Sequence, residues 1–117
     1  MYGFPGEFSH VLMNLLGNAR DAILTSPVIE GRILLRIGTQ GTMGVVSVVD
    51  NGVGIPAEIV GRIFEPYFTT KVQGTGIGLN MSKLIIESNM NGRLEVDSGA
   101  GGTTFTIFVP LAEGGLS

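Results

Sequence analysis

The hydrophobic residues near the start of the chain recur at a helical period. Between residues 5 and 24 they lie three or four positions apart, which gathers them on one face of a helix. These apolar positions are Leu12, Leu15, Leu16, Ala19 and Ile23. Three polar residues, Asn14, Asn18 and Asp21, fall on nearly the opposite face. The pattern predicts an amphipathic helix over residues 5–24 that ends before Pro27.

Four other segments have the composition of strands, and three of them alternate with a period of two. Residues 31–38 alternate apolar and polar side chains, and residues 44–50 form a second run that ends in Asp50. Two further alternating runs, 92–98 and 103–110, are separated by a short glycine-rich turn. These runs predict four strands, of which the last two form a hairpin.

Two segments between the second and third strands are expected to be helical. Residues 55–64 read as a short helix with Pro56 near its start. Residues 76–90 form a longer helix with apolar side chains on two faces, and such a helix is expected to be wedged between layers. The two sets are Ile77, Met81, Leu84 and Ile85 on one face and Leu79, Ile86 and Met90 on the other. The order α-β-β-α-α-β-β predicts one α/β domain, a two-layer α+β sandwich with helices on one face of a sheet.

Composition narrows the class of protein. The hydrophobic fraction of 44% is high for 117 residues and agrees with elements that are covered on most faces. The chain has no cysteine, which excludes disulfides and thiolate metal sites. A net charge of −3 without any basic run argues against nucleic acid as a partner. No apolar stretch approaches the roughly 18 residues of a membrane span, so we expect no direct membrane insertion.

The polar face of the first helix has two readings. Asn and Asp are disfavoured inside helices, because their side chains compete for backbone groups. The row formed by Asn14, Asn18 and Asp21 could be a solvated face. It could also supply oxygen ligands to Mg²⁺, a cation that takes few protein ligands when phosphate oxygens complete its shell. The helix alone leaves both readings open.

A second candidate site lies where the strand over residues 44–50 ends. Asp50 is followed by Gly52 and Gly54, which permit a tight turn. A plain glycine turn would explain the pattern. A dinucleotide-binding fingerprint does not explain the pattern, because the acidic residue that would bind the ribose is missing from the end of a second strand about 20 positions later. An ionised Asp50 would only accept hydrogen bonds, so it would select adenine, whose amine donates, over guanine, whose matching oxygen accepts.

A third candidate is the glycine run before the last predicted helix. Gly74, Gly76 and Gly78 could expose backbone N–H groups to an anion where that helix begins. Lys71 stands ahead of the glycines, and the Walker A order G-x-x-x-x-G-K-[ST] is absent. A flexible surface loop is the alternative reading. If nucleotide binds here, the segment 65–80 is expected to act as a lid and to be the least ordered internal segment without it.

The order of these signals resembles that of one protein family. Asn-x-x-x-Asn on a helix, Asp-x-Gly-x-Gly after a strand, a Phe-containing segment and Gly-x-Gly-x-Gly before a helix look like the ATP-binding domain of sensor histidine kinases. That domain belongs to the GHKL superfamily, with gyrase, MutL and heat-shock chaperones. The matching segments are NLLGNARDAI for the N box, DNGVGIP and GTGIGL for the glycine boxes, FEPYFTTK for the F box and GGTTFTIFVP for the closing strand.

This resemblance spans nearly the whole chain and implies the Bergerat fold, with a mixed sheet, helices packed on one face and a mobile ATP lid. It also implies ATP and Mg²⁺ as ligands. Asn18 would hold the metal, Asn14 would lie beside the phosphates and Lys71 would reach over them. These three residues would then be the catalytic ones.

The resemblance further implies which residues form the nucleotide pocket. Asp50 would hold the adenine amine, with Thr103 or Thr104 as its partner. The implied ATP-binding set is Asn14, Asn18, Asp21, Asp50, Gly52, Gly54, Ile55, Phe68, Lys71, Gly74, Thr75, Gly76, Ile77, Gly78, Leu79 and Thr103.

Two positions depart from the common patterns of the superfamily. ATPase members place a glutamate where this chain has Asn14, and an amide cannot accept a proton, so hydrolysis by this domain alone is expected to be slow. That difference favours a kinase over a gyrase-like ATPase. Histidine kinases often carry Lys or Arg where Asp21 stands, so the phosphate charge is expected to rest more on Lys71.

We therefore expect the catalytic domain of a two-component sensor histidine kinase, which transfers the γ-phosphoryl group of ATP to a histidine on another domain. His10 is the only histidine and is expected to be an ordinary residue of the first helix. Because a dimerisation hairpin does not fit ahead of it, residues 1–117 are expected to be a single domain from a longer protein.

The expected partners are that phosphoacceptor domain and a response regulator, in the cytoplasm, with membrane anchoring of a longer parent left open. Two alternatives stay open. One is a stand-alone serine kinase of the anti-sigma-factor type, which shares these motifs. The other is an interaction module that has lost nucleotide binding.

Overall fold

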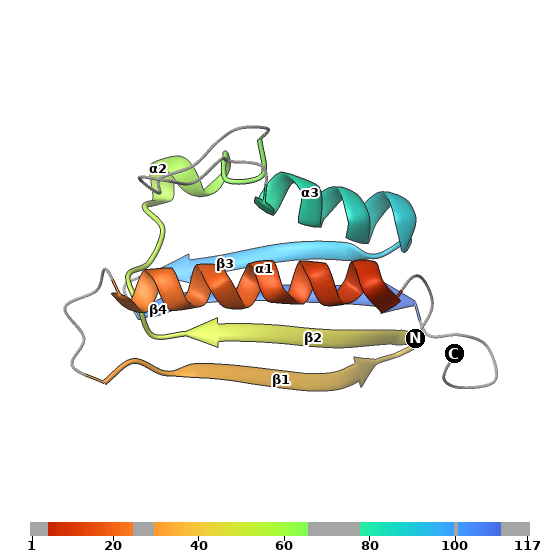
Figure 1. Ribbon diagram of the computed structural model, residues 1–117, viewed down its shortest axis with the longest axis horizontal. Helices are drawn as coiled ribbons and strands as arrows, with labels where there is room; N and C mark the ends of the chain where they lie inside the picture. The colour runs from red at the N-terminus through yellow and green to blue at the C-terminus, as the bar shows by residue number, and fades with distance from the viewer. Residues whose placement is uncertain (1–4, 25–29, 66–77, 100, 111–117) are drawn as a thin grey trace.

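The computed structural model describes residues 5–24, 30–65, 78–99 and 101–110 of the chain (Figure 1). Its elements follow the predicted order of helices and strands. They are α1 (Pro5–Leu24), β1 (Ile33–Gln40), β2 (Met43–Asp50), α2 (Ala57–Val60), α3 (Gly78–Leu84), the π-helical turn η1 (Ile85–Asn89), β3 (Arg93–Gly99) and β4 (Gly102–Pro110).

The sheet is antiparallel throughout its described strands and has the order β1-β2-β4-β3. The mixed sheet expected from the family resemblance is therefore wrong for these four strands. β1 and β2 form one hairpin, β3 and β4 form another, and the hairpins join between β2 and β4. This join pairs Asp50 with Thr103 and Met43 with Pro110. It places residues from distant parts of the chain in the same row of the sheet.

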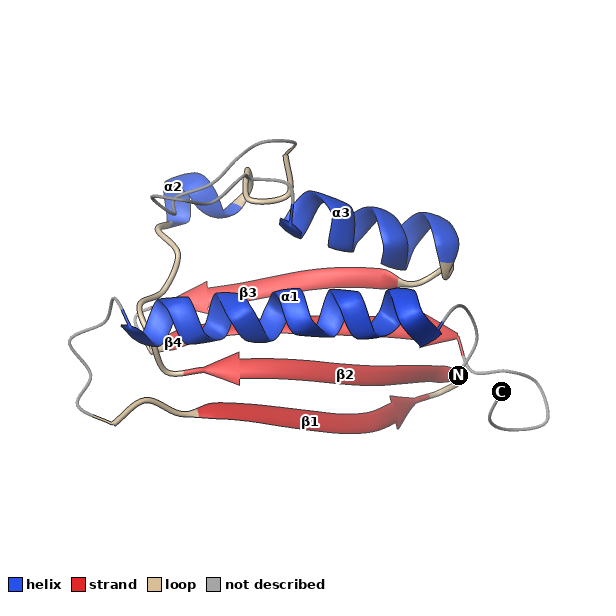
Figure 2. Ribbon diagram, viewed as in Figure 1, coloured by secondary structure: helices blue, strands red, loops and turns tan. Residues whose placement is uncertain are grey.

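One hydrophobic core lies between the sheet and the helices that cover one of its faces (Figure 2). Along β2 and β4 every second residue is buried, as alternation predicts. α1 contributes Val11, Leu15 and Ala19 at helical spacing, with Leu12 and Leu16 partly buried beside them. Full burial of a leucine such as Leu15 contributes about 1.5–3 kcal/mol. The predicted helix and the middle of its apolar stripe are confirmed.

α3 and η1 pack against this core by one side only. Ile85, Ile86 and Met90 are buried, whereas Met81 and Leu84 are 40% and 49% exposed. The prediction of a helix buried on two faces is therefore wrong for Met81 and Leu84. A π-helical hydrogen bond of 3.1 Å from Met90 N to Ile85 O widens the last turn. Ile85 and Ile86 both lie in this turn and are buried, so burial concentrates at this end of the helix.

Two elements lie at the margin of the fold. The helix predicted within residues 55–64 is the single turn α2. β1 is an edge strand, and all of its residues are exposed. None of the helices in the described ranges is both long enough and apolar enough to cross a bilayer.

Candidate functional site

The carboxylate of Asp50 is fixed at the end of β2. Only 5% of the residue is exposed, and its Oδ1 accepts the backbone N–H of Gly52 at 2.9 Å. The backbone N–H of Thr103 also donates to this carboxylate. Burial raises the pKa of Asp50 above its ordinary value, and these two hydrogen bonds oppose that rise. A carboxylate has about four acceptor positions, so capacity for a further donor remains.

The loop after Asp50 is held closely between α1 and the β3–β4 hairpin. Gly52 is buried, and a Cβ there would overlap the backbone of Ala22 in the last turn of α1. Gly54 meets the hairpin in the same way, because its Cβ would overlap the carbonyl oxygen of Gly99. Glycine is required at both positions by this close approach. These contacts explain the two glycines and are compatible both with a structural turn and with a binding loop.

A row of polar side chains crosses the sheet at this end. Asp50 pairs with Thr103 across β2 and β4, and Thr103 pairs with Ser98 across β4 and β3. The Oγ of Ser98 lies 2.8 Å from Oγ1 of Thr103. Thr104 pairs with Val49 and lies on the opposite face of the sheet, because side chains alternate along a strand. Of the two threonines considered, Thr103 is therefore the one beside Asp50.

The polar face of α1 connects this loop to α3. Nδ2 of Asn14 donates to Oγ of Ser82 at 3.2 Å, and Ser82 is fully buried. Ala22, two helical turns further along, accepts the backbone N–H of Val53 at 3.1 Å. Asn18 stands one turn from each of these residues and so lies between the α3 contact and the glycine loop. Asn14 and Asn18 are half-buried, so this face is not a freely solvated one.

Asp21 lies at the edge of this region rather than inside it. Its side chain is 35% exposed, and its Oδ1 is 3.5 Å from an amino nitrogen of Arg20. Arg20 is itself 70% exposed, and an ion pair so open to water contributes little stability. His10, on the same helix, is exposed.

Six residues of the predicted ATP-binding set lie outside the described residues. They are Phe68, Lys71, Gly74, Thr75, Gly76 and Ile77. The predicted lid falls largely on the same segment. Gly78 begins α3, and Leu79 is partly buried against the core.

Sequence reasoning missed two residues that shape this end of the molecule. Asn51 ties the loop to the start of β1. Its Oδ1 accepts the backbone N–H of Arg32 at 2.6 Å, and its Nδ2 donates to the carbonyl oxygen of Glu30 at 3.0 Å. The Asn-Gly pair after Asp50 could have indicated such a turn-forming amide. Ser98 was read only as part of an alternating strand, although a serine on the inward face requires a partner.

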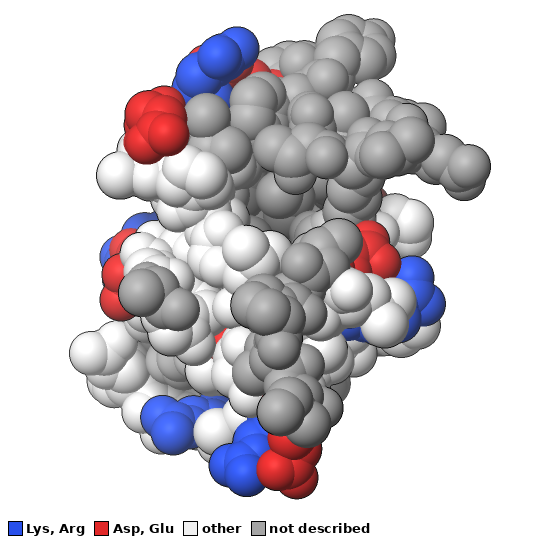
Figure 3. Space-filling view, turned by 90° about the vertical axis from the view of Figure 1, so that its left-hand side faces the viewer, with Lys and Arg blue, Asp and Glu red and all other residues white. Residues whose placement is uncertain are grey.

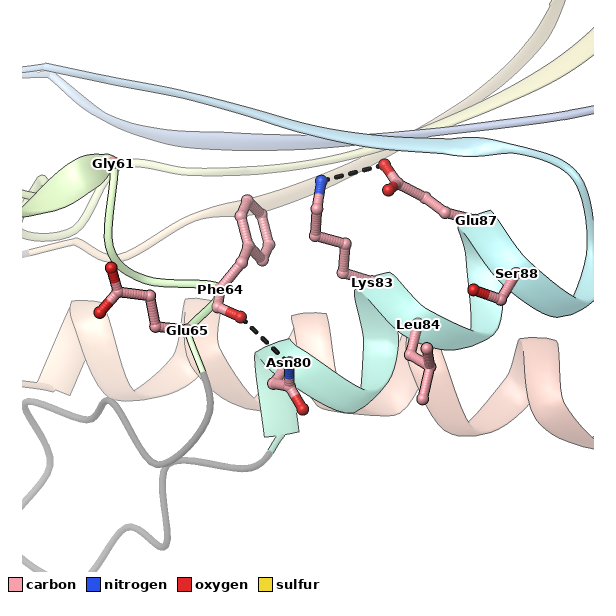
Figure 4. Close-up of a pocket in the computed structure, with 8 residues that line it drawn as sticks. All are labelled: Gly61, Phe64, Glu65, Asn80, Lys83, Leu84, Glu87 and Ser88. Atoms are coloured by element: carbon pink, nitrogen blue, oxygen red, sulfur yellow. Dashed lines mark hydrogen bonds and ion pairs between the residues drawn. The ribbon is translucent and has the colours of Figure 1, made fainter.

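A cavity of about 430 Å³ lies elsewhere, between the segment after α2 and the outer side of α3 (Figure 4). Among the described residues, none of those predicted to bind nucleotide lines it. Its polar groups are satisfied mostly by one another: Nζ of Lys83 is 3.0 Å from Glu87 and lies over the ring of Phe64. The described residues that line it are Gly61, Phe64, Glu65, Asn80, Lys83, Leu84, Glu87 and Ser88.

Figure 3 looks onto the end of the molecule where β2 ends and β3 turns into β4. Charged side chains lie around the margin of this view, and uncharged residues occupy most of its described centre. Within the described ranges, no three His, Cys, Asp or Glu side chains are grouped so that they could hold a metal ion.

The sequence matches a known protein family and several of its characterised members. Residues 4–113 match the family model described as histidine kinase-, DNA gyrase B-, and HSP90-like ATPase. The sensor histidine kinase ZraS of Escherichia coli K12 is 40% identical over 108 residues, which cover 92% of this chain and 22% of that protein. The sensory histidine kinase/phosphatase NtrB of Rhodobacter capsulatus is 38% identical over 119 residues, which cover 94% and 33%.

Two solved structures with a similar fold are also histidine kinases. The catalytic domain of histidine kinase ThkA, in a nucleotide-free form, superimposes with a TM-score of 0.80 at 32% identity over 92% of this chain and 69% of that one. The mycobacterial sensor histidine kinase MprB gives a TM-score of 0.78 at 27% identity over 92% and 72%. The chain spans a third or less of the two curated relatives compared above.

Proposed function

The chain belongs to the histidine kinase-, DNA gyrase B- and HSP90-like ATPases, an ATP-binding family, and on that premise we propose that it binds Mg·ATP as the catalytic domain of a sensor histidine kinase. Its fold is the Bergerat fold of histidine kinase catalytic domains. The relatives compared are named as sensor kinases, which favours this function over a stand-alone serine kinase. The proposal treats residues 1–117 as one domain of a longer protein.

The observation that carries the proposal is the buried carboxylate of Asp50 at the end of β2. It is oriented by Gly52 and Thr103 and keeps acceptor capacity for a ligand. An adenine amine could donate to it, whereas the oxygen at the matching position of guanine would face a second acceptor. Burial makes each hydrogen bond to this carboxylate more favourable, so a further donor from a ligand would be strongly held.

The polar face of α1 is suited to the triphosphate. The hydrogen bond from Asn14 to Ser82 fixes the orientation of that amide. Asn18 lies between this contact and the glycine loop, and its carbonyl oxygen is a suitable ligand for Mg²⁺ that phosphate oxygens already partly neutralise. Bound there, the metal would offset the charge that develops during phosphoryl transfer. Lys71 and the backbone of residues 74–79 would contact the phosphates from the lid side.

The reaction proposed for the whole kinase is transfer of the γ-phosphoryl group to a histidine of a phosphoacceptor domain. The histidine nitrogen would form a bond to the γ-phosphorus as the bond to the bridging oxygen of ADP breaks. Asn14 cannot remove a proton from water, so this domain would bind ATP and hydrolyse it only slowly. Catalysis would come from positioning and charge neutralisation. A response regulator would receive the phosphoryl group next, in the cytoplasm.

Calorimetric titration of the chain with ATP in the presence of Mg²⁺ tests the binding half of this proposal. Saturable binding with one site per chain is expected. Joining the chain to the phosphoacceptor hairpin of its parent protein tests the other half, because labelled γ-phosphate should then appear on protein as an acid-labile, alkali-stable phosphohistidine. Absence of ATP binding at millimolar nucleotide would contradict the proposal. An acid-stable phosphoserine on a partner would favour the serine-kinase alternative.

A further inference from the structure

The hydroxyl of Ser98 lies at the junction of three segments. Its Oγ accepts the backbone N–H of Ile55 at 2.7 Å, which is the hydrogen bond between the glycine loop and β3. The same oxygen lies 2.8 Å from Oγ1 of Thr103 and 3.3 Å from the carbonyl oxygen of Gly102. One hydroxyl therefore links the loop, the β3–β4 turn and the polar row of the sheet.

All three contacts of Ser98 can exist at once. A serine hydroxyl has one donor and two acceptor positions. If Thr103 donates its hydroxyl proton to Ser98 and Ile55 donates its N–H, both acceptor positions are used. The proton of Ser98 then goes to the carbonyl oxygen of Gly102. This arrangement leaves no hydrogen-bonding capacity of Ser98 unused, as expected for a group that fixes geometry.

The position of Ser98 relates it to the binding residues rather than to the core. Ile55 ends the loop that begins at Gly52, and that loop is already held on its other side by α1. Without the Ser98 hydroxyl, the Ile55 N–H would lose its acceptor, and the far end of the loop would keep only the close contact between Gly54 and Gly99 among its described contacts with β3. The Asp50 carboxylate accepts hydrogen bonds from Gly52, at the start of the loop, and from Thr103, the hydroxyl neighbour of Ser98.

We infer that Ser98 is a positioning residue for the adenine pocket: its hydroxyl fixes the loop 52–55 and Thr103 in the arrangement that presents Asp50 to the base. This inference rests on the proposed function, because it assigns Ser98 a role in binding the adenine of ATP. Ser98 acts through Ile55 and Thr103 and is not itself assigned a contact with the nucleotide.

The test compares Ser98→Ala with the conservative variant Ser98→Thr, which retains an Oγ. Affinities for adenosine and for Mg·ATP are measured by calorimetry, and hydrogen exchange of the Ile55 amide is followed by NMR. Loss of a hydrogen bond that fixes a binding group is expected to weaken binding by a factor of about two to ten. Ser98→Ala should weaken adenosine and Mg·ATP by the same factor, because the base pocket serves both, and it should speed exchange at Ile55.

Ser47→Ala is the matched control. Ser47 also lies in a strand of this sheet, and its Oγ is 3.4 Å from Oγ1 of Thr106, so this variant removes a similar hydroxyl pair away from the loop. Ser47→Ala should leave nucleotide affinity and Ile55 exchange unchanged, and Ser98→Thr should restore both. If Ser98→Ala does not fold, Ser98→Thr and Ser98→Val form a second pair that differs by the hydroxyl alone.

Three results distinguish a failure of the role assigned to Ser98 from a failure of the proposed function. Wild-type affinity in the variants that lack the Ser98 hydroxyl, with normal binding by the parent chain, would overturn the role of Ser98 and leave the proposed function standing. Equal losses of affinity in Ser47→Ala and Ser98→Ala would show that the loss comes from general destabilisation. That result would also overturn the role of Ser98. No binding of adenosine or Mg·ATP by the parent chain would refute the proposed function, and with it the role in adenine binding.

Discussion

Asp50 and Gly52 are joined by a hydrogen bond of 2.9 Å between the carboxylate Oδ1 and the backbone N–H. The side chain proposed to recognise the base thus also sets the first turn of the loop that surrounds it. Changes at Asp50 are expected to act on nucleotide affinity directly and on loop geometry only weakly, provided that an acceptor oxygen is kept.

Replacing Asp50 by asparagine keeps an oxygen for Gly52 but removes the charge. We expect Asp50→Asn to weaken ATP binding by at least a factor of about ten to a hundred, since hydrogen bonds to charged groups contribute about 1.5–3 kcal/mol. Calorimetric titration measures this loss, and circular dichroism checks that the fold is kept. Asp97→Asn, at an exposed carboxylate of β3, is the control and should bind normally. Unchanged affinity in Asp50→Asn would remove the adenine assignment.

The same carboxylate should distinguish the two purines. GTP is expected to bind at least about tenfold more weakly than ATP, because an oxygen of guanine would face the acceptor oxygens of Asp50 where adenine offers an amine. Competition of each nucleotide against a fluorescent ATP analogue gives the ratio. Inosine, which also carries an oxygen at that position, should compete as poorly as guanosine when compared with adenosine. Equal affinities across this set would contradict base selection by Asp50.

Burial of Asp50 has a consequence for stability that depends on pH. Because the pKa of Asp50 is raised in the folded protein above the 3.8 of an exposed aspartate, the folded state binds the proton more tightly than the unfolded chain. Raising the pH from 3.8 through the raised pKa therefore lowers the contribution of this residue to stability, by at most about 1.4 kcal/mol per pH unit.

Asp50→Asn lacks this titration, so its free energy of unfolding relative to that of the parent chain should increase with pH over that window and then level off. Urea unfolding of both proteins across a pH series measures the difference. Asp97→Asn serves again as the reference for a general charge effect. A difference that stays constant or decreases with pH would contradict a raised pKa at Asp50.

Lys71 is predicted from the sequence to contact the phosphates. Lys71→Ala should weaken ATP binding by more than it weakens adenosine binding, since only ATP carries the groups that a lysine would attract. Lys83→Ala removes the same charge from a residue whose Nζ is paired with Glu87 at 3.0 Å, and it should change neither affinity. Losses of equal size for ATP and adenosine in Lys71→Ala would place Lys71 away from the phosphates.

The turn between β3 and β4 should tolerate a methyl group at one glycine and not at the next. Gly102 has a φ of 129°, and a Cβ there would overlap the carbonyl oxygen of Asp50, whereas a Cβ at Gly101 would meet open space. Gly102→Ala is therefore expected to lower the free energy of unfolding by about 1–3 kcal/mol. Gly101→Ala should change it far less. Urea unfolding measures both, and equal losses would contradict the contact between Gly102 and Asp50.

Much of the fold could be predicted because its elements carry strong periods. The helix over residues 5–24 and the strands β2 and β4 were predicted correctly from single segments. The order of strands could not be derived in that way, since pairing of β2 with β4 depends on contacts across the chain. Met81 and Leu84 were misjudged because apolar residues on a helix do not reveal which side is covered.

The candidate site was predictable where a residue type is unusual in its context. Asp50 at the end of an apolar strand and the glycines after it are such signals. Thr103 and Thr104 could not be separated from the sequence, and the strand register places only Thr103 beside Asp50. The inward position of Ser98 indicates that it needs a partner, but the sequence does not show which one, because the hydrogen bond is to Ile55, far away in the chain.

The pairing of β2 with β4 determines when the pocket can form during synthesis. Asp50 leaves the ribosome long before Thr103, its neighbour in the sheet, so the end of β2 must wait for almost the whole domain. Contacts this distant in sequence form late and slowly compared with those of a hairpin. The complete adenine pocket is therefore expected to form only in the late steps of folding. Tight nucleotide binding is expected only in chains in which β4 has already paired with β2. ATP binding would then indicate that the domain has finished folding.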